Sequence, residues 1–316
     1  MIRTLVSALT AGPTVGGQAV IEGVMMRAKN RLAIAVRKAD GSIVVELRPW
    51  FNLTTLALFK KPFLRGFPVL LETLVNGIKA LNFSAMQAAE SEEGDSELSS
   101  WHLVLTMIVA LGVALGLFVV VPHFLSIVMQ WVGLSGDVES LSFNFWDGLY
   151  KMLIFVGYIA AISFVPDIRR VFQYHGAEHK VIWNFEEGKG LSVEAARSYS
   201  RLHPRCGTSF LLFVLAVSIL LYTAVVPQLL KIYKPEMFLL KHLYIVGAKL
   251  LFMVPISCIA YEIIRFAGKF NSNILCRMLC WPGLALQMMT TKEPDDGQLE
   301  VAMAALKCAV SEEGCS

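Results

Sequence analysis

The sequence predicts a mainly helical, polytopic membrane protein with about four transmembrane helices, a small N-terminal β-element and cytoplasmic amphipathic helices. Of its 316 residues, 55% are apolar and 17% are charged, whereas soluble globular proteins average about 45–50% and about 25%. The mean hydropathy is +0.58. The apolar excess is gathered into four separate runs, and this distribution is typical of a protein that crosses a bilayer several times.

The four apolar runs cover residues 103–122, 149–166, 209–227 and 244–264. Each is close to the ~20 helical residues that cross ~30 Å of hydrocarbon. Lys151 and Lys249 lie near span ends, where we expect their ammonium groups to extend to the headgroups.

The distribution of basic residues predicts the orientation of these spans. Residues 123–148 contain no Lys or Arg. The central loop, residues 167–208, contains Arg169, Arg170, Lys180, Lys189, Arg197, Arg201 and Arg205, and the tail adds Arg265, Lys269 and Arg277. Only Lys231, Lys234 and Lys241 depart from this pattern. Because an excess of Lys and Arg marks the cytoplasmic side, we expect both termini and the central loop to be cytoplasmic.

The segment before the first span, residues 1–100, has the composition of a small β-element followed by a helix. Residues 31–37 and 42–48 read as strands, joined at Asp40-Gly41, which is a strong hairpin signal. Residues 19–27 are the candidate third strand. Residues 68–89 carry apolar side chains on one face, as in a helix that lies along a membrane, and the acidic residues 90–97 read as a linker.

The central loop of the membrane domain, residues 101–270, also reads as helical. Helical spacing from Ile168 to Ile182 predicts one helix that ends at Gly188 and Gly190, and Ser192 is a plausible N-cap for a second helix over 193–202. In the C-terminal segment, residues 271–316, the apolar stretch 274–289 is too short to span and is expected at the surface or re-entrant. Residues 298–310 read as an amphipathic helix.

The most specific local pattern is His175-Gly176-Ala177-Glu178-His179. Residues four apart are neighbours on a helix, so both imidazoles can reach one metal ion. Glu178 could then accept a proton from a water molecule, as in the H-x-x-E-H order of some metallopeptidases. The alternative is two histidines and a glutamate that line a helix at the membrane surface.

A third metal ligand can come from His203, Cys206 or Glu262. His203 and Cys206 immediately precede the third span, and Glu262 lies near the cytoplasmic end of the fourth, where a carboxylate usually has a partner. Arg205 could stabilise developing negative charge. The alternatives are a chain break at His203-Pro204, a buried thiol at Cys206, and an ion pair of Glu262 with Arg265.

A glycine-rich segment near the N-terminus supplies further polar residues. Gln18, Glu22 and Arg27 could line a polar cleft or pair within the β-element. The segment lacks the strand-to-helix context of a nucleotide loop, so we predict no phosphate site here.

Several of these segments together resemble a known family. Residues 16–27, YHGAEHK at 174–180, HPRCGTSF at 203–210, Tyr261-Glu262 and PGLALQMMTTKEP at 282–294 are similar in order and spacing to the YqhQ family of uncharacterised bacterial membrane proteins. Members of that family are described in places as predicted metal-dependent enzymes. The resemblance implies a multi-pass protein of the bacterial cytoplasmic (inner) membrane.

Two functions of different classes fit these patterns. The first is a zinc-dependent or other divalent-metal-dependent hydrolase, a peptidase being one form, with its site at the cytoplasmic interface. The second is a non-catalytic membrane scaffold or assembly factor that binds a partner protein or, through Arg169, Arg170, Arg201 and Arg205, anionic lipid. A transporter fits less well, because the first and third spans carry no charged residue. The net charge of +3 is too small to indicate nucleic acid.

Overall fold

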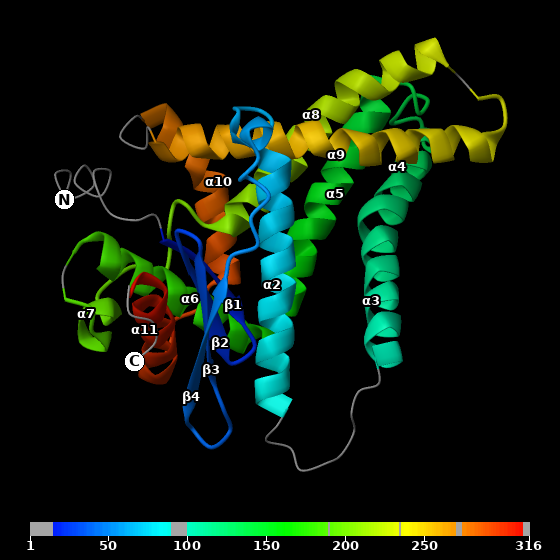
Figure 1. The fold of residues 1–316 in the computed structure, drawn as a ribbon. Coiled ribbons are helices and arrows are strands. Elements are labelled where there is room, and N and C mark those ends of the chain that lie inside the picture. The colour runs from blue at the N-terminus through cyan, green and yellow to red at the C-terminus, as the bar shows by residue number, and fades with distance from the viewer. Residues whose placement is uncertain (1–14, 90–99, 189, 234, 270–273, 312–316) are drawn as a thin grey trace.

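The computed structural model describes residues 15–89, 100–188, 190–233, 235–269 and 274–311. It contains a four-stranded sheet, a set of long apolar helices and shorter helices packed on the sheet (Figure 1). The linker expected at 90–97 lies outside the described residues.

The sheet is an antiparallel meander in the order β1 (Val15–Val20), β2 (Gly23–Ala28), β3 (Arg31–Arg37) and β4 (Ile43–Pro49). The expected hairpin is confirmed: Gly41 has a φ of +87°, and the Asp40 carboxylate accepts the Ser42 amide. The single strand expected at 19–27 is wrong, because the chain turns at Glu22, whose φ is +50°. Four strands are therefore formed where three were predicted.

Helices cover both faces of the sheet (Figure 1). On one face Val24, Met26 and Ala33 pack with residues of α6 (Pro166–Glu186) and α11 (Asp296–Val310). On the other face Met25 and Ile34 pack toward α2 (Gly66–Ala89). Because successive side chains of a strand point to opposite faces, β1 and β2 contribute residues both to the core with α6 and α11 and to the core with α2.

Helix α2 agrees with the predicted helix, but several residues of its buried face are polar. Glu72, Asn76 and Ser84 are buried, while Leu74 and Ile78 are exposed. The Glu72 carboxylate accepts the backbone amides of the chain just before the short η1 helix (Ala57–Lys60), at 2.7 Å each. The apolar stripe is thus exposed on the outward face, and its contact with a membrane stays a prediction.

Four helical segments are long and apolar enough to span a membrane, as predicted: Ile108–Trp131, Leu141–Ile162, Gly207–Ile232 and Leu239–Ala267. They belong to α3 (Ser100–Leu115), η2 (Gly116–Val120), α4 (Val121–Trp131), α5 (Leu141–Ile162), α8 (Gly207–Ile232) and α9 (Phe238–Lys269). The first span extends beyond the expected end at Pro122. A π-helical turn, η2, precedes α4, and Pro122 lies in the first turn of α4, where a proline does not break the helix. The second begins earlier, where Ser140 caps α5 by accepting the Phe143 amide at 3.1 Å.

The C-terminal part returns to the sheet. Helix α10 (Ile274–Thr290) runs through Pro282 without a break and packs on α8, where Gly283 lies against Ser209. Residues 291–295, here called the strap, then lead into α11, which Asp295 and Gln298 cap reciprocally. The strap runs along α6, where the Lys292 amide donates to the Phe172 carbonyl at 2.8 Å.

The expected helices of the central loop are present with one difference in length. Helix α6 ends at Glu186, followed by Gly188 with a φ of +65°. Ser192 caps the next helix as predicted, but α7 covers only Val193–Arg197 and not the full stretch to residue 202. The remaining residues form the irregular turn that carries His203 to the start of α8.

Candidate functional site

Helix α6 places the H-x-x-E-H residues in the interior. His175, Glu178 and His179 are all buried, and the two imidazole rings lie one helical turn apart with centroids at 4.5 Å. The helix is held there because Tyr174, Ala177 and Val181 pack against the sheet and α11. The histidines therefore face the start of α8 and the end of α10, and not open solvent.

Cys206 completes a compact triad with the two histidines. One possible ligand atom from each of His175, His179 and Cys206 lies within 4.8 Å of the others. Cys206 is the N-cap residue of α8, and its thiol lies 3.2 Å from Nε2 of His175 and 3.1 Å from Oγ1 of Thr208. Imidazole nitrogen and thiolate sulfur are the ligands that zinc prefers.

The backbone fixes the tautomers of both histidines. Nδ1 of His175 lies 2.8 Å from the Thr290 carbonyl, and Nδ1 of His179 lies 2.6 Å from the Arg201 carbonyl. A carbonyl only accepts, so each Nδ1 carries the proton and each Nε2 presents a lone pair. Nε2 of His179 is buried without a hydrogen-bond partner among the described residues. Metal-binding histidines are oriented in this same way by outer carbonyl groups.

Burial and neighbouring groups together lower the pKa values of both His179 and Cys206. Burial lowers the pKa of His179, which keeps its ring neutral. Burial raises the pKa of the Cys206 thiol, but the adjacent His179 and Thr208 more than offset this, and the net pKa is lowered. A neutral imidazole is the form in which a histidine binds a metal ion.

Glu178 lies beside the triad and against the first strand. Burial raises the pKa of its carboxyl to about 8. Its side chain packs directly on Gly17 of β1, so closely that a Cβ at Gly17 would lie 2.9 Å from the Glu178 Cδ atom. A glycine at that position lets a strand of the sheet form one wall of the site.

His203 lies next to the triad but is used differently. Its ring centroid is 5.7 Å from that of His179 and 4.8 Å from that of Trp183. Its Nδ1 accepts the Arg205 amide at 3.3 Å, so its Nε2 carries the proton, 3.5 Å from Glu186. Burial lowers the pKa of His203 to about 4. Of the three candidates for the third ligand, the geometry favours Cys206 over His203.

Glu262 and Arg205 are engaged by other partners. The Glu262 carboxylate receives two hydrogen bonds from Arg65, at 2.7 and 2.6 Å, so its ion-pair partner is Arg65 and not the expected Arg265. The Arg205 guanidinium pairs with Glu186 and is 40% exposed. The structure brings together His175, Glu178, His179, His203 and Cys206, while the Arg205 and Glu262 side chains are held elsewhere.

Gln18, Glu22 and Arg27 do not share a cleft. Gln18 packs on Gly77 of α2, and Glu22 binds Arg170 and accepts the Tyr174 hydroxyl at 3.3 Å. The Arg27 guanidinium lies 4.0 Å from the centre of the Trp50 ring. The alternative, pairing within the β-element, does not describe Gln18 and Glu22 either, because their partners lie on α2 and α6.

With this geometry in hand, two comparisons with known proteins place the chain. A family model described as "Protein of unknown function (DUF1385)" matches residues 61–312. The chain belongs to this family. It is also 37% identical over 303 residues to "Uncharacterized protein YqhQ" of Bacillus subtilis (strain 168), covering 92% of this chain and 90% of that protein. No solved structure gives a significant match.

The family assignment confirms the resemblance read from the sequence motifs. The matched region contains the whole triad and Glu178, whereas Gly17 precedes it. Neither match carries an activity, so the metal-dependent part of the expectation stays a prediction.

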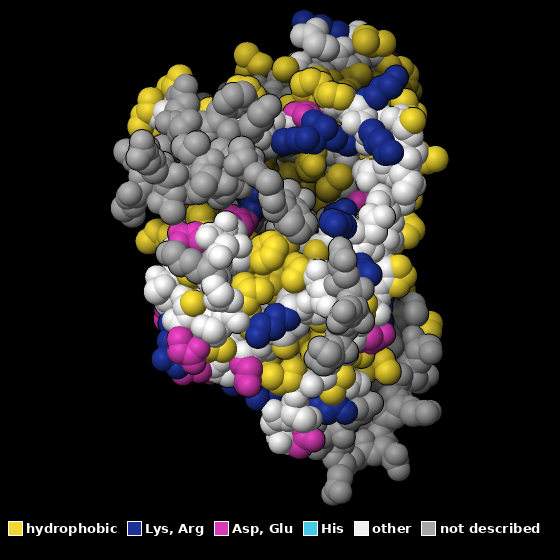
Figure 2. All heavy atoms as spheres, turned by 60° about the vertical axis from the view of Figure 1, so that its left-hand side comes forward, with side chains coloured by type: hydrophobic (Ala, Val, Ile, Leu, Met, Phe, Trp, Pro, Cys, Tyr) yellow, Lys and Arg dark blue, Asp and Glu magenta, His cyan; other side chains and the backbone are white. Residues whose placement is uncertain are grey.

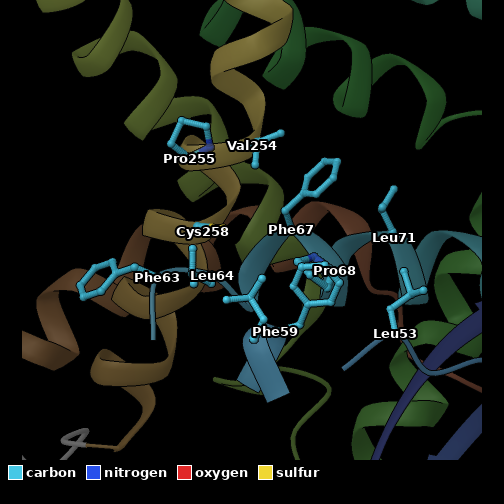
Figure 3. Close-up of a pocket in the computed structure, with 11 residues that line it drawn as sticks. Leu53, Phe59, Phe63, Leu64, Phe67, Pro68, Leu71, Val254, Pro255 and Cys258 are labelled. Carbon is cyan, nitrogen blue, oxygen red and sulfur yellow. The ribbon is translucent and has the colours of Figure 1, made fainter. Parts of the chain in front are cut away.

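An apolar pocket lies apart from this site (Figure 3). It has a volume of about 320 Å³, and Phe59, Phe63, Phe67 and Pro255 are among its lining residues. None of the triad residues lines it. On the face in Figure 2, hydrophobic side chains are mixed with Lys and Arg, and no histidine side chain is visible.

The sequence interpretation missed the backbone groups that orient the histidines. The carbonyls of Arg201 and Thr290 come from segments 22 and 115 residues away from their histidines. A carbonyl has no sequence pattern of its own. Only the HPRCGT stretch, between Arg201 and α8, could have indicated that this part of the chain returns to α6.

Proposed function

We propose that the protein is a metal-dependent hydrolase in which His175, His179 and Cys206 hold zinc or another divalent cation. One observation carries the proposal: three nitrogen and sulfur atoms converge within 4.8 Å, with both Nδ1 atoms already committed to carbonyls. Such a donor set with fixed tautomers fits a tetrahedral cation, with one position left for water.

The residues of the chain would then divide the chemistry among them. A zinc ion at the triad supplies Lewis-acid activation of water at neutral pH. Glu178, beside the triad, is the general base that accepts the proton, and a nearby cation would favour its ionised form. Arg205 is paired with Glu186 and would have to leave that carboxylate to stabilise charge on a substrate.

A non-catalytic scaffold is the second candidate, and the enclosure of the site favours it. The triad and Glu178 side chains are between 1% and 9% exposed. A metal held there would join α6 to the start of α8, as closed structural sites do. The anionic-lipid form of this candidate has fewer basic groups to use, since Arg170, Arg201 and Arg205 already bind Glu22, the Thr291 carbonyl and Glu186.

We further propose that the protein lies in the cytoplasmic membrane with both termini and the triad on the cytoplasmic side. The support is the absence of Lys and Arg from residues 123–148, against seven in the central loop. The triad sits on α6, which follows the second candidate span directly, and on Cys206, which directly precedes the third.

Metal content tests the site. We expect full-length protein purified in detergent with added zinc to bind one equivalent. His179→Ala should lose most of this metal, because one of three ligands is gone. His203→Gln is the matched control: it removes the adjacent buried histidine, which is not a ligand, and should keep the metal. Equal loss in both variants, or no stoichiometric metal in the wild type, would contradict the proposed ligand set.

Hydrolysis separates the two candidates. Glu178→Gln should keep its metal, since Glu178 is a base and not a ligand. Wild type and this variant are each incubated in nanodiscs with a mixture of peptides, and new N-termini are identified by mass spectrometry. New termini in the wild type alone support a peptidase. Metal without any wild-type-specific termini would favour the scaffold.

A further inference from the structure

Three charged side chains meet inside the candidate membrane spans, away from the triad. Asp147 and Lys151 lie on α5, and Lys249 lies on α9. Both lysine Nζ atoms donate to the same carboxylate oxygen, Oδ2 of Asp147, at 2.6 and 2.8 Å. The expectation that these lysines extend to the headgroups is therefore wrong, because the second and fourth candidate spans begin earlier than predicted and both side chains turn inward.

The cluster contains one more positive charge than negative when all three groups are ionised. The side chains of Asp147, Lys151 and Lys249 are 4%, 10% and 11% exposed, so solvent does little to screen them. Because both lysine nitrogens lie close to the same oxygen, at 2.6 and 2.8 Å, the distance between the two nitrogens cannot exceed the sum of these two distances. Two like charges this close, buried among membrane helices, strongly disfavour each other.

Among the described residues, no further carboxylate pairs with either lysine of the cluster. Oδ1 of Asp147 is buried without a hydrogen-bond partner among the described residues. The two lysines therefore share Oδ2, and the second carboxylate oxygen accepts from neither of them. Tyr222 of α8 places its ring 5.9 and 5.7 Å from the two nitrogens, but its hydroxyl donates to the Lys249 carbonyl. Glu139, the nearest acidic residue before Asp147 in the sequence, pairs with Lys241.

Of the other helices, α4 packs on α5 through His123, whose ring contacts Phe143 with centroids at 5.3 Å. Phe143 lies one turn before Asp147 on α5. At the contact between α4 and α5, the His123 ring therefore packs against an aromatic ring.

We infer that Asp147, Lys151 and Lys249 form a proton-exchange site within the membrane domain. One lysine Nζ–H bond breaks, the proton passes to a water molecule, and the electron pair stays on the nitrogen as a neutral amine. The other lysine remains an ammonium ion paired with the Asp147 carboxylate. The buried cluster then has no net charge, and taking up one proton charges the junction of α5, α8 and α9.

Nitrogen NMR of the full-length protein in nanodiscs tests this directly, because a neutral lysine amine and an ammonium group have distinct ¹⁵N shifts. With ¹⁵N-lysine labelling, we expect one neutral amine resonance at about pH 9, more than a unit below the usual lysine pKa of about 10.4. A wild-type spectrum with every lysine as ammonium at that pH would overturn the inference by itself.

Substitutions identify the source of the neutral resonance. Lys151→Met and Lys249→Met should each abolish it, because either change leaves a balanced pair of one lysine and one aspartate. Lys241→Met is the matched control: it removes a lysine of the same helix, α9, that forms an ion pair with Glu139, and the neutral resonance should remain. A neutral resonance that persists in both cluster variants would assign it elsewhere and refute the site.

Discussion

Gly17 is the residue at which the sheet meets the proposed site. The position tolerates no side chain, since a Cβ there would lie 2.7 Å from the Met25 carbonyl and 2.9 Å from Glu178 Cδ. A Cβ added at its neighbour Gly16 would have no neighbouring atom within 4 Å. Two adjacent glycines thus differ completely in what a methyl group would meet.

We expect Gly17→Ala to lower the free energy of unfolding by about 1–3 kcal/mol, the usual cost of overpacking. Gly16→Ala should change it by no more than about 0.5 kcal/mol, as an open position does. Denaturant unfolding in detergent measures both. Equal effects of the two substitutions would mean that the strand does not press on Glu178.

At the residue scale, the sequence identified the metal candidates but could not rank them. The spacing of His175 and His179 follows from helical geometry, so their convergence could be predicted. Whether His203 or Cys206 turns inward depends on the irregular turn around Pro204 and on the N-cap of α8, which no periodicity describes. Glu262 was a candidate because a carboxylate in a span usually needs a partner, and that partner is Arg65, 197 residues away in sequence.

At the scale of elements, α6 depends on the close passage of the strap. A Cβ at Gly176 would lie 2.1 Å from the Lys292 carbonyl oxygen, a backbone atom that cannot move by a rotamer change. The strap follows Thr290, whose carbonyl orients His175. The contact therefore links the stability of the fold to the geometry of the triad.

We expect Gly176→Ala to destabilise the protein by at least about 2 kcal/mol and to weaken metal binding, because the strap must move. The matched control is Gly157→Ala in α5, also helical but with open space around it. There the better helix propensity of alanine should stabilise by up to about 1 kcal/mol. Thermal unfolding with and without zinc compares the two, and a stable Gly176→Ala variant with full metal content would refute the strap's role.

The elements themselves were predicted where a pattern is local. The four apolar runs, the Asp40-Gly41 turn and the Ser192 cap each depend on a few adjacent residues. The strand at 19–27 was wrong because the turn at Glu22 adopts a positive φ without a turn dipeptide. The end of the first span was wrong because a π-helical turn accommodates Pro122, and this compensation has no simple sequence pattern.

At the scale of the whole molecule, distant parts of the chain form one layered unit around the sheet. Helix α11 and α6 cover one face and α2 the other, so the N-terminal sheet, the central loop and the C-terminal helix pack together (Figure 1). All three should therefore lie on the same side of the membrane, as the distribution of basic residues also indicates.

Cysteine labelling in intact cells measures this orientation. We expect Ser135→Cys, between the first and second spans, to react with a membrane-impermeant maleimide. Ser198→Cys, an exposed position just after α7, should react only after the cells are opened. The unsubstituted protein gives the background from native cysteines, and the reverse pattern at both positions would overturn the orientation.

The central claim is that one cation is held by two imidazoles and the Cys206 thiolate, and zinc K-edge X-ray absorption tests it most directly. For the wild-type protein we expect one sulfur neighbour at about 2.3 Å and nitrogen neighbours at about 2.0–2.1 Å. Cys206→Ser should lose the sulfur contribution, and His203→Gln should leave the spectrum unchanged. Bound zinc with no sulfur neighbour, or with the same spectrum in Cys206→Ser, would contradict the account.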